Sequence, residues 1–233
     1  GVVVIEERGA VCVRVERVSA HIWAVSTWVL VPVRVWLVAA EDGVTLVDAG
    51  IPSMAGAILQ AVDRLGAGPL RRILLTHGHS DHTGAIARIL RQRPVPVCAH
   101  ALEIPYMTGQ LPYPRRRAAA ATVSPGVAEP LTEEAPGVLA RVGGLRPYLT
   151  PGHSPGHVAY YPEQDRVLLA GDLFTTRRGR IGRPMAIFTA DMAEAVRSAA
   201  TVARLRPDRL EICHGGPVLN PAEQIVEYLA AAG

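Results

Sequence analysis

The chain opens with short apolar runs separated by turn residues, a pattern that predicts β-strands. Two hairpins are expected in the first fifty residues, 2–5 with 11–15 around Arg8-Gly9, and 33–39 with 44–47. The second signal is the stronger one, because its strands flank Glu41-Asp42-Gly43 and an Asp-Gly step supplies the positive φ of a tight turn. We therefore expect the chain to begin as sheet.

After residue 50, helical spacing alternates with strand-like runs. Pro52-Ser53 opens a run with apolar residues at helical spacing that closes at Gly66, and an apolar strand over 73–76 leads into a helix over 83–90. Further expected strands are 95–99, 138–142, 146–149, 158–161, 167–169 and 209–213, and further expected helices are a short one from His100 to near Pro105, 189–205 and 221–231. This order predicts an α/β protein with two similar halves, each a sheet with helices outside.

The segment 107–136 interrupts this order. Glycine, proline, arginine and alanine fill it without a sustained period. Irregular segments of this length inside a compact domain are usually functional or mobile. We expect a flap or insertion around 107–136 beside the functional site, within a single domain that spans 1–233.

Composition narrows the class of protein. Of the 233 residues, 49% are hydrophobic and 19% are charged, which fits a globular protein and excludes a disordered chain. The longest apolar stretch, 22–38, is broken by polar residues and falls short of the roughly 20 residues of a membrane span. A net charge of +3 gives no indication of nucleic-acid binding. Three scattered cysteines and the lack of a signal-peptide pattern predict a cytoplasmic location.

The strongest candidate for a functional site directly follows the apolar run at 73–75. Four metal-capable side chains occupy six consecutive positions: His77, His79, Asp81 and His82. Imidazole nitrogens and carboxylate oxygens bind divalent cations, so one tight turn can supply ligands to two adjacent metal ions. The loop should lie at the C-terminal edge of a sheet, where open α/β sheets place ligands.

Three more candidates follow expected strands, and each would be unremarkable alone. They are His153 in Thr150-Pro151-Gly152-His153, Asp172 in Ala170-Gly171-Asp172, and His214 in Cys213-His214-Gly215-Gly216. Because all three come at strand ends and in addition to the histidine loop, we interpret the set as one site.

This ordered set of motifs, HxHxDH, PGH, GD and HGG over about 33–217, resembles the metallo-β-lactamase fold superfamily of metal-dependent hydrolases. The resemblance implies a four-layer αββα sandwich of two mixed β-sheets with helices on the outer faces. It implies two divalent metal ions, with zinc favoured and manganese or iron also suited to His/Asp ligands. By motif position, His77, His79 and His153 would bind the first metal, Asp81, His82 and His214 the second, and Asp172 would bridge them. Asp48 would orient a ligand.

Asp81 and Asp172 are also the candidate catalytic residues, because their charges would tune a bridging water. Two divalent ions bring four positive charges, of which these carboxylates cancel two while the histidines stay neutral. The remaining charge would lower the pKa of the water toward about 7 and polarise a substrate oxygen.

Other histidines and a cysteine near these motifs are not expected to be ligands. His157 should hydrogen-bond nearby backbone, and His21 and His100 should be structural or on the surface. Cys213 should be a buried small hydrophobe whose side chain points to the opposite face of its strand from His214.

The predicted activity is hydrolysis of a small ester, thioester or lactone by metal-bridged hydroxide. Asp172 disfavours a true β-lactamase, which lacks the bridging Asp, and His79 disfavours flavodiiron members, which carry Glu there. Only 19 residues follow His214, which leaves glutathione thioester hydrolysis of the glyoxalase II type unsupported. Thr175 stands where acyl-homoserine lactonases carry a Tyr, so that hydroxyl is missing or comes from elsewhere, with Tyr106 or Tyr113 as candidates.

Two alternatives stay open. A phosphodiesterase could use the arginines of 177–183 to hold phosphate, and a metal-bound sensor or binding module would have no turnover. The expected partner is a small-molecule substrate, with neither nucleic acid nor membrane involved and with a homodimer left open.

Overall fold

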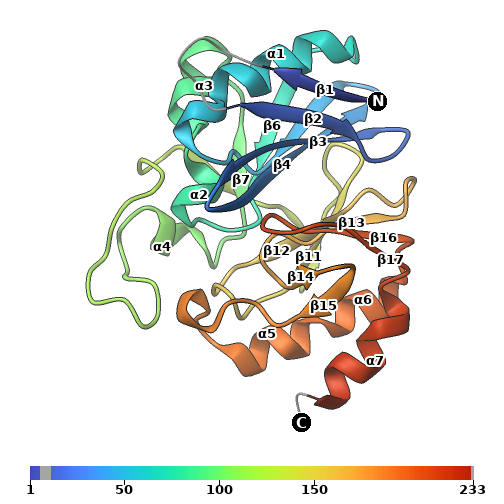
Figure 1. Cartoon of the computed structure of the whole chain (residues 1–233). Coiled ribbons are helices and arrows are strands. Elements are labelled where there is room, and N and C mark those ends of the chain that lie inside the picture. Colours follow the sequence, from blue (N-terminus) through green and yellow to red (C-terminus); the bar gives the residue numbers. More distant parts are fainter. Residues whose placement is uncertain (6–11, 232–233) are drawn as a thin grey trace.

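The structure is a computed structural model that describes residues 1–5 and 12–231. Two large mixed β-sheets face each other, and helices cover their outer faces (Figure 1). The expected four-layer αββα sandwich is confirmed.

The first sheet has eight strands in sequence order, which are β1 (Val2–Ile5), β2 (Val13–Arg17), β3 (Ile22–Val29), β4 (Val31–Ala40), β5 (Gly43–Val47), β6 (Leu70–Leu74), β7 (Val97–Ala99) and β8 (Ala128–Pro130). β1 to β5 pair antiparallel, and β5 to β8 pair parallel. Every residue of β5 is buried, as expected of a strand whose two faces are both covered.

The second sheet has five strands, in the order β11 (Arg146–Leu149), β12 (Val158–Tyr161), β13 (Val167–Leu169), β16 (Arg209–Glu211) and β17 (Val218–Leu219). Only β13 and β16 are parallel. Two small hairpins lie apart from these sheets, β9 (Glu133–Ala135) with β10 (Val138–Leu139), and β14 (Thr175–Arg177) with β15 (Arg180–Gly182).

One hydrophobic core fills the space between the sheets. It joins Trp36 of β4 to Tyr160 of β12, both fully buried. The helices of the first half are α1 (Ala55–Leu65), preceded by η1 (Pro52–Met54), then α2 (Ser80–Thr83), α3 (Ile86–Gln92) and α4 (Ile104–Met107). A second cluster packs the other sheet against α6 (Ala200–Leu205) and α7 (Ala222–Ala231), next to α5 (Met192–Ser198) and η2 (Ala186–Phe188). Among the described residues, no helix combines the length and apolar character needed to cross a membrane.

Most expected elements are present. The hairpin around Asp42-Gly43 forms, and α1 ends at Gly66, whose φ of 61° is the left-handed conformation of a helix C-cap. The first hairpin pairs β1 with β2, while the turn expected at Arg8-Gly9 lies outside the described residues.

Several local predictions are wrong for identifiable reasons. The helix over 83–90 is split, because the N–H groups of Gly84 and Ala85 donate to the carbonyls of Gly50 and Ala49 instead of to the preceding helical turn. The helix over 189–205 breaks at Ala199, where the hydrogen bonds tighten to i→i−3. The short helix starts at Ile104 and not at His100.

Several strands were not predicted from the sequence. They are β3 and the short strands β14, β15 and β17, which have only two or three residues each. The later part of 107–136 is more ordered than expected, because it contains β8 and β9.

Candidate metal centre

The histidine loop leaves the C-terminal end of β6, beside β5 and β7 in the parallel part of the first sheet. Asp48, just after β5, holds the start of this loop by accepting hydrogen bonds from the Thr76 N–H at 2.8 Å and the Thr76 hydroxyl at 2.7 Å. Gly78 lets the loop pack against its surroundings, because a Cβ there would collide with Met107 and Tyr113. The loop is thus fixed by contacts on both sides.

The second sheet supplies the remaining candidates from the ends of its strands. His153 follows β11, Asp172 follows β13 and His214 follows β16. The structure brings all seven predicted site residues together where the two sheets meet. Two groups of close donor atoms form, one from His77, His79 and His153, the other from His82, Asp172, Cys213 and His214.

Asp172 stands at the centre of the cluster. Its Oδ2 atom lies 3.2 Å from Nε2 of His82, 3.3 Å from Nε2 of His153, 3.5 Å from Nε2 of His214 and 3.7 Å from Nε2 of His77. One carboxylate oxygen therefore contacts imidazoles from both donor groups. Asp81 closes the other side, with its Oδ2 atom 2.9 Å from Nε2 of His214.

Four of the five imidazoles are oriented through Nδ1, which leaves Nε2 toward the centre. The partners are Thr76 for His77, Asp48 for His82, Thr189 for His153 and the Pro32 carbonyl for His214, at 2.8 to 3.2 Å. A hydrogen bond at one ring nitrogen fixes the tautomer and the ring orientation of a metal-binding histidine. The described hydrogen bonds give His79 no such partner, and its ring instead lies 4.8 Å from that of Tyr113.

The buried polar atoms of this cluster fit a metal site. Within the described chain, Nε2 of His77, Nε2 of His153 and Oδ1 of Asp172 are buried without a hydrogen-bond partner. Burial, reinforced by neighbouring imidazoles, lowers the pKa of His77 well below its usual value and that of His79 to about 3. In the second donor group burial acts in the same direction, but the carboxylates of Asp172 and Asp81 outweigh it and raise the pKa of His82 and His214. Neutral imidazoles and ionised carboxylates are the protonation states that bind metal ions.

Comparison with known proteins agrees with this arrangement. Residues 28–214 match the model of the metallo-beta-lactamase superfamily. The chain is 38% identical over 199 residues to "Probable metallo-hydrolase YybB" of Bacillus subtilis, covering 85% of this chain and 88% of that protein.

The chain belongs to the metallo-β-lactamase superfamily.

A relative and a solved structure add detail. The chain is 32% identical over 148 residues to a hydroxyacylglutathione hydrolase of Methylobacillus flagellatus, a match that covers 63% of this chain and half of that protein. The metallo-β-lactamase FIM-1 from Pseudomonas aeruginosa, in its mono-zinc form, aligns over 94% of this chain and 96% of its own with a TM-score of 0.71. At 18% identity, the FIM-1 likeness concerns the fold alone.

The histidines expected not to be ligands have other partners in this superfamily member. His157 is fully buried, its Nδ1 atom lies 2.9 Å from the Thr150 hydroxyl, and its Nε2 atom accepts the backbone N–H of Asp172 at 3.1 Å. The expected backbone hydrogen bond is confirmed, and it holds the chain at Asp172. His21 pairs with Asp165, and His100 accepts the N–H of Leu102.

The prediction for Cys213 is wrong in one respect. Its thiol is buried as expected, but its sulfur lies within 4.8 Å of donor atoms of His82, Asp172 and His214. β16 ends at Glu211, so the strand alternation used to place the Cys213 side chain away from His214 no longer applies there.

Sequence reasoning missed Glu103. This fully buried carboxylate accepts hydrogen bonds from the Gly78 N–H (3.2 Å) and the Tyr113 hydroxyl (2.7 Å) at Oε1, and from the Ser154 hydroxyl (3.0 Å) and the Gly156 N–H (2.7 Å) at Oε2. It therefore ties together the loop of His77 and His79, the loop of His153 and the 107–136 segment. Glu103 lies among apolar positions in the sequence, but the sequence does not show that its carboxylate is buried.

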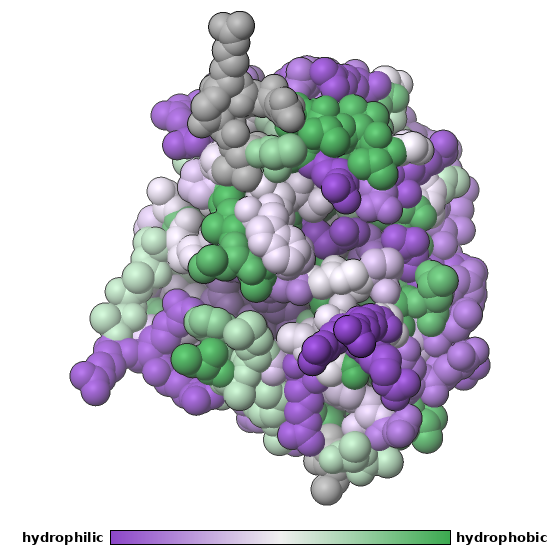
Figure 2. Space-filling view, viewed as in Figure 1, coloured by the Kyte–Doolittle hydropathy of each residue, from purple (hydrophilic) through white to green (hydrophobic). Residues whose placement is uncertain are grey.

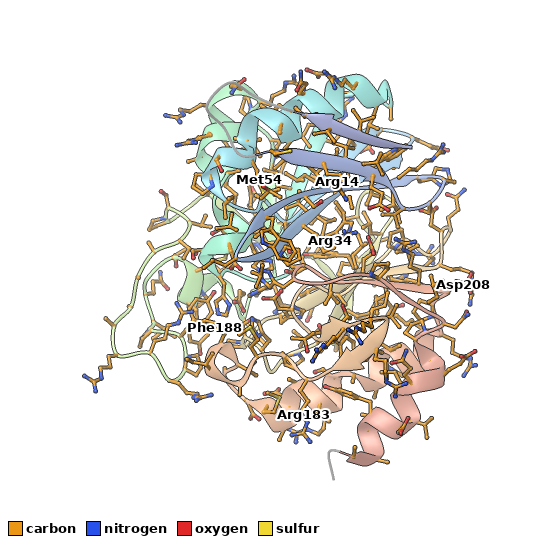
Figure 3. The ribbon with its side chains drawn as sticks, in the orientation of Figure 1. Arg14, Arg34, Met54, Arg183, Phe188 and Asp208 are labelled. Carbon is orange, nitrogen blue, oxygen red and sulfur yellow. The ribbon has the colours of Figure 1, made fainter. Side chains whose placement is uncertain are left out.

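A cavity of about 460 Å³ opens onto the centre. Its polar floor includes His79, Asp81, His153, Asp172 and His214. Its walls are largely apolar. They come from the hairpin tip between β3 and β4 (Val29, Leu30, Val31), from the segment around η2 (Pro184, Met185, Phe188) and from Phe174, which lies directly before β14. Figure 2 shows a hollow on this face with green apolar side chains at its rim, and Figure 3 labels Phe188.

Proposed function

We propose that this protein is a dinuclear metal-dependent hydrolase of a small ester, thioester or lactone. Membership of the superfamily and similarity to a metallo-hydrolase identify the chain as a metal-dependent hydrolase. The two-metal site and the substrate class are our inference. The observation that carries it is the position of Asp172, whose single Oδ2 atom lies within 3.7 Å of imidazoles from both donor groups.

The proposed ligands follow the two donor groups, with Asp81, which contacts His214, in place of Cys213 in the second. His77, His79 and His153 would hold one ion, Asp81, His82 and His214 the other, and Asp172 would contact both. Metal ions in such a site activate a water as nucleophile and polarise the substrate carbonyl. His/Asp donors suit zinc, manganese and iron.

The chain's own residues prepare this site before any substrate arrives. Hydrogen bonds at Nδ1 orient the metal-binding imidazoles, from Asp48 to His82, Thr189 to His153 and the Pro32 carbonyl to His214. These histidines therefore need little rearrangement to bind a metal ion. His157 fixes Asp172 through its backbone N–H, and Asp172 and Asp81 supply the two negative charges of the site. Apolar walls limit water around the floor of the cavity.

The two tyrosines considered as sources of a hydroxyl have other roles. The Tyr113 hydroxyl donates to Glu103, and Tyr106 stacks on Tyr113 and is not among the described cavity-lining residues. Thr175 does line the cavity, but its hydroxyl donates to the Arg183 carbonyl. None of the arginines of 177–183 is among those lining residues, so the phosphate contact expected of these arginines has no support at this cavity.

A hydrolysis panel with metal-reconstituted protein tests the proposal. Esters, thioesters, lactones and phosphodiesters would be compared for the wild type and for Asp172→Asn. We expect turnover on at least one carbonyl substrate and its loss in the variant. Turnover confined to phosphodiesters, or no turnover with two metals bound, would contradict the proposal.

A further inference from the structure

Arg116 is the cationic side chain of the described cavity lining, and no ion pair is found for it among the described residues. Its guanidinium carbon lies 5.6 Å from the centroid of the Tyr113 ring, and that ring lies 4.8 Å from His79. Arg116 is therefore beside the His77, His79, His153 donor group. A guanidinium placed there is suited to a carboxylate or a similar anion.

The turn that carries Arg116 is anchored on both sides. The Arg116 N–H donates to the Tyr113 carbonyl, and the Tyr113 hydroxyl donates to buried Glu103. The neighbouring Arg115 donates to the carbonyls of Ala186 and Thr189 at 2.9 and 2.8 Å. Arg116 is thus held at the cavity by a fixed backbone, which lowers the entropy cost of using it.

The opposite end of the centre is apolar. The tip of the β3–β4 hairpin adjoins His214, because the Pro32 carbonyl binds Nδ1 of that histidine. Leu30 forms the tip, is 92% exposed and has a φ of 63°. A leucine is strained in the left-handed region, and such outliers are common at binding sites. Exposing a large apolar side chain in this way is understandable if a ligand covers it.

We propose that the substrate has an apolar arm of several carbons on one side of its scissile bond and an anionic group on the other. The arm packs on Leu30 and the apolar wall near His214, and the anion pairs with Arg116 near His79. Because His79 and His214 belong to different donor groups, a molecule spanning the centre meets both features. This inference rests on the proposed hydrolase function and specifies its substrate class.

A two-by-two panel of esters tests it with the metal-loaded protein. Benzyl acetate, 4-carboxybenzyl acetate, benzyl hexanoate and 4-carboxybenzyl hexanoate separate the apolar arm from the anion. We expect kcat/KM to be highest for 4-carboxybenzyl hexanoate, by about two- to fivefold over benzyl hexanoate, because the Arg116 side chain is exposed and solvent weakens an exposed charge pair.

Two variants and a control assign the effects. Arg116→Gln should abolish the preference for the carboxylate, so that 4-carboxybenzyl hexanoate and benzyl hexanoate are cleaved with equal kcat/KM. Leu30→Asn should abolish the preference for hexanoate, and asparagine tolerates the positive φ at that position. Arg117→Gln, the same charge change one residue on at a position outside the described cavity lining, should leave both preferences intact.

Measurements of ligand binding show which has failed, the inferred substrate class or the proposed hydrolase function. Hexyl benzyl ether and hexyl 4-carboxybenzyl ether cannot be hydrolysed and are titrated calorimetrically. If no ester is cleaved but the carboxylated ether binds tighter and Arg116→Gln removes that difference, the ligand class stands and the hydrolase function falls. Equal slowing of neutral and anionic esters by Arg116→Gln, or no carboxylate preference in turnover or binding, would overturn the inference.

Discussion

Asp172 is the residue on which the account depends most. Replacing it with asparagine keeps its shape but removes a negative charge and a strong oxygen donor. We expect Asp172→Asn to lose bound metal and to lower turnover by at least about a hundredfold, the scale of losing a general base or an oxyanion donor. Elemental analysis and steady-state kinetics on one substrate measure both effects. Asp208→Asn, a matched change in an exposed pair with Arg166, should leave both unchanged (Figure 3). Near-native rates with two metals bound in Asp172→Asn would contradict its assigned position.

Glu103 is a residue-scale prediction of a different kind, because it acts on the loops and not on the substrate. Its two carboxylate oxygens each accept two hydrogen bonds. In Glu103→Gln, an amide NH2 group would replace one of these oxygens, and two buried donors would then face another donor. We expect Glu103→Gln to lower the free energy of unfolding by about 2–3 kcal/mol, as measured by urea denaturation. Glu133→Gln, at an exposed position in β9, is the control and should change it little. Equal stability of the two variants would show that the Glu103 hydrogen bonds do not hold the loops.

At the scale of elements, a buried ion pair joins the two sheets. Arg34 of β4 donates to Glu211 of β16 at 2.6 Å, and Trp36 Nε1 donates to the same carboxylate oxygen at 3.2 Å. Figure 3 labels Arg34 between the blue sheet and the second sheet. The side chain of Glu211 is fully buried, so its charge depends on these partners and on Arg209, whose Nη2 atom lies 3.5 Å from the other carboxylate oxygen.

Removing one member of this pair should cost far more than removing both. We expect Arg34→Met to lower the free energy of unfolding by up to about 3–5 kcal/mol, because the buried Glu211 charge is then compensated only by the longer contact with Arg209. The double variant Arg34→Met with Glu211→Leu should recover most of that loss, since well-packed apolar pairs often replace buried ion pairs without cost. A small loss in the single variant, or an additive loss in the double one, would contradict this description of the sheet interface.

The 107–136 segment is the other feature at this scale, and its role as a flap stays a prediction. Arg115 ties it to Ala186 and Thr189, and Arg115 has a φ of 68°. We expect Arg115→Asn, which tolerates that backbone, to speed limited proteolysis within the segment because both hydrogen bonds are lost. Arg117→Asn is the control, and equal cleavage rates would mean that the tether does not order the segment.

At the scale of the whole molecule, element order predicted two sheets with helices outside, and the resemblance in motifs implied the four-layer sandwich. HxHxDH follows an apolar run, and His153, Asp172 and His214 each follow an expected strand, so the strand ends together with the histidine loop predicted one site. The roles of Glu103 and Cys213 depend on contacts between distant segments and on where a strand ends. Strands such as β14 and β17 are too short to produce a readable period.

The dinuclear centre is the central claim, and the metal content of the whole protein tests it most directly. The purified chain would be saturated with zinc, and separately with manganese or iron, freed of excess metal, and analysed for metal per chain by elemental analysis and native mass spectrometry. The account predicts two ions per chain, because seven donors are gathered where a tetrahedral site needs only four. It further predicts that Asp81→Asn retains the ion of the His77, His79 and His153 group more tightly than the ion of the His82 and His214 group. A stoichiometry fixed at one ion per wild-type chain under metal-replete conditions would contradict it.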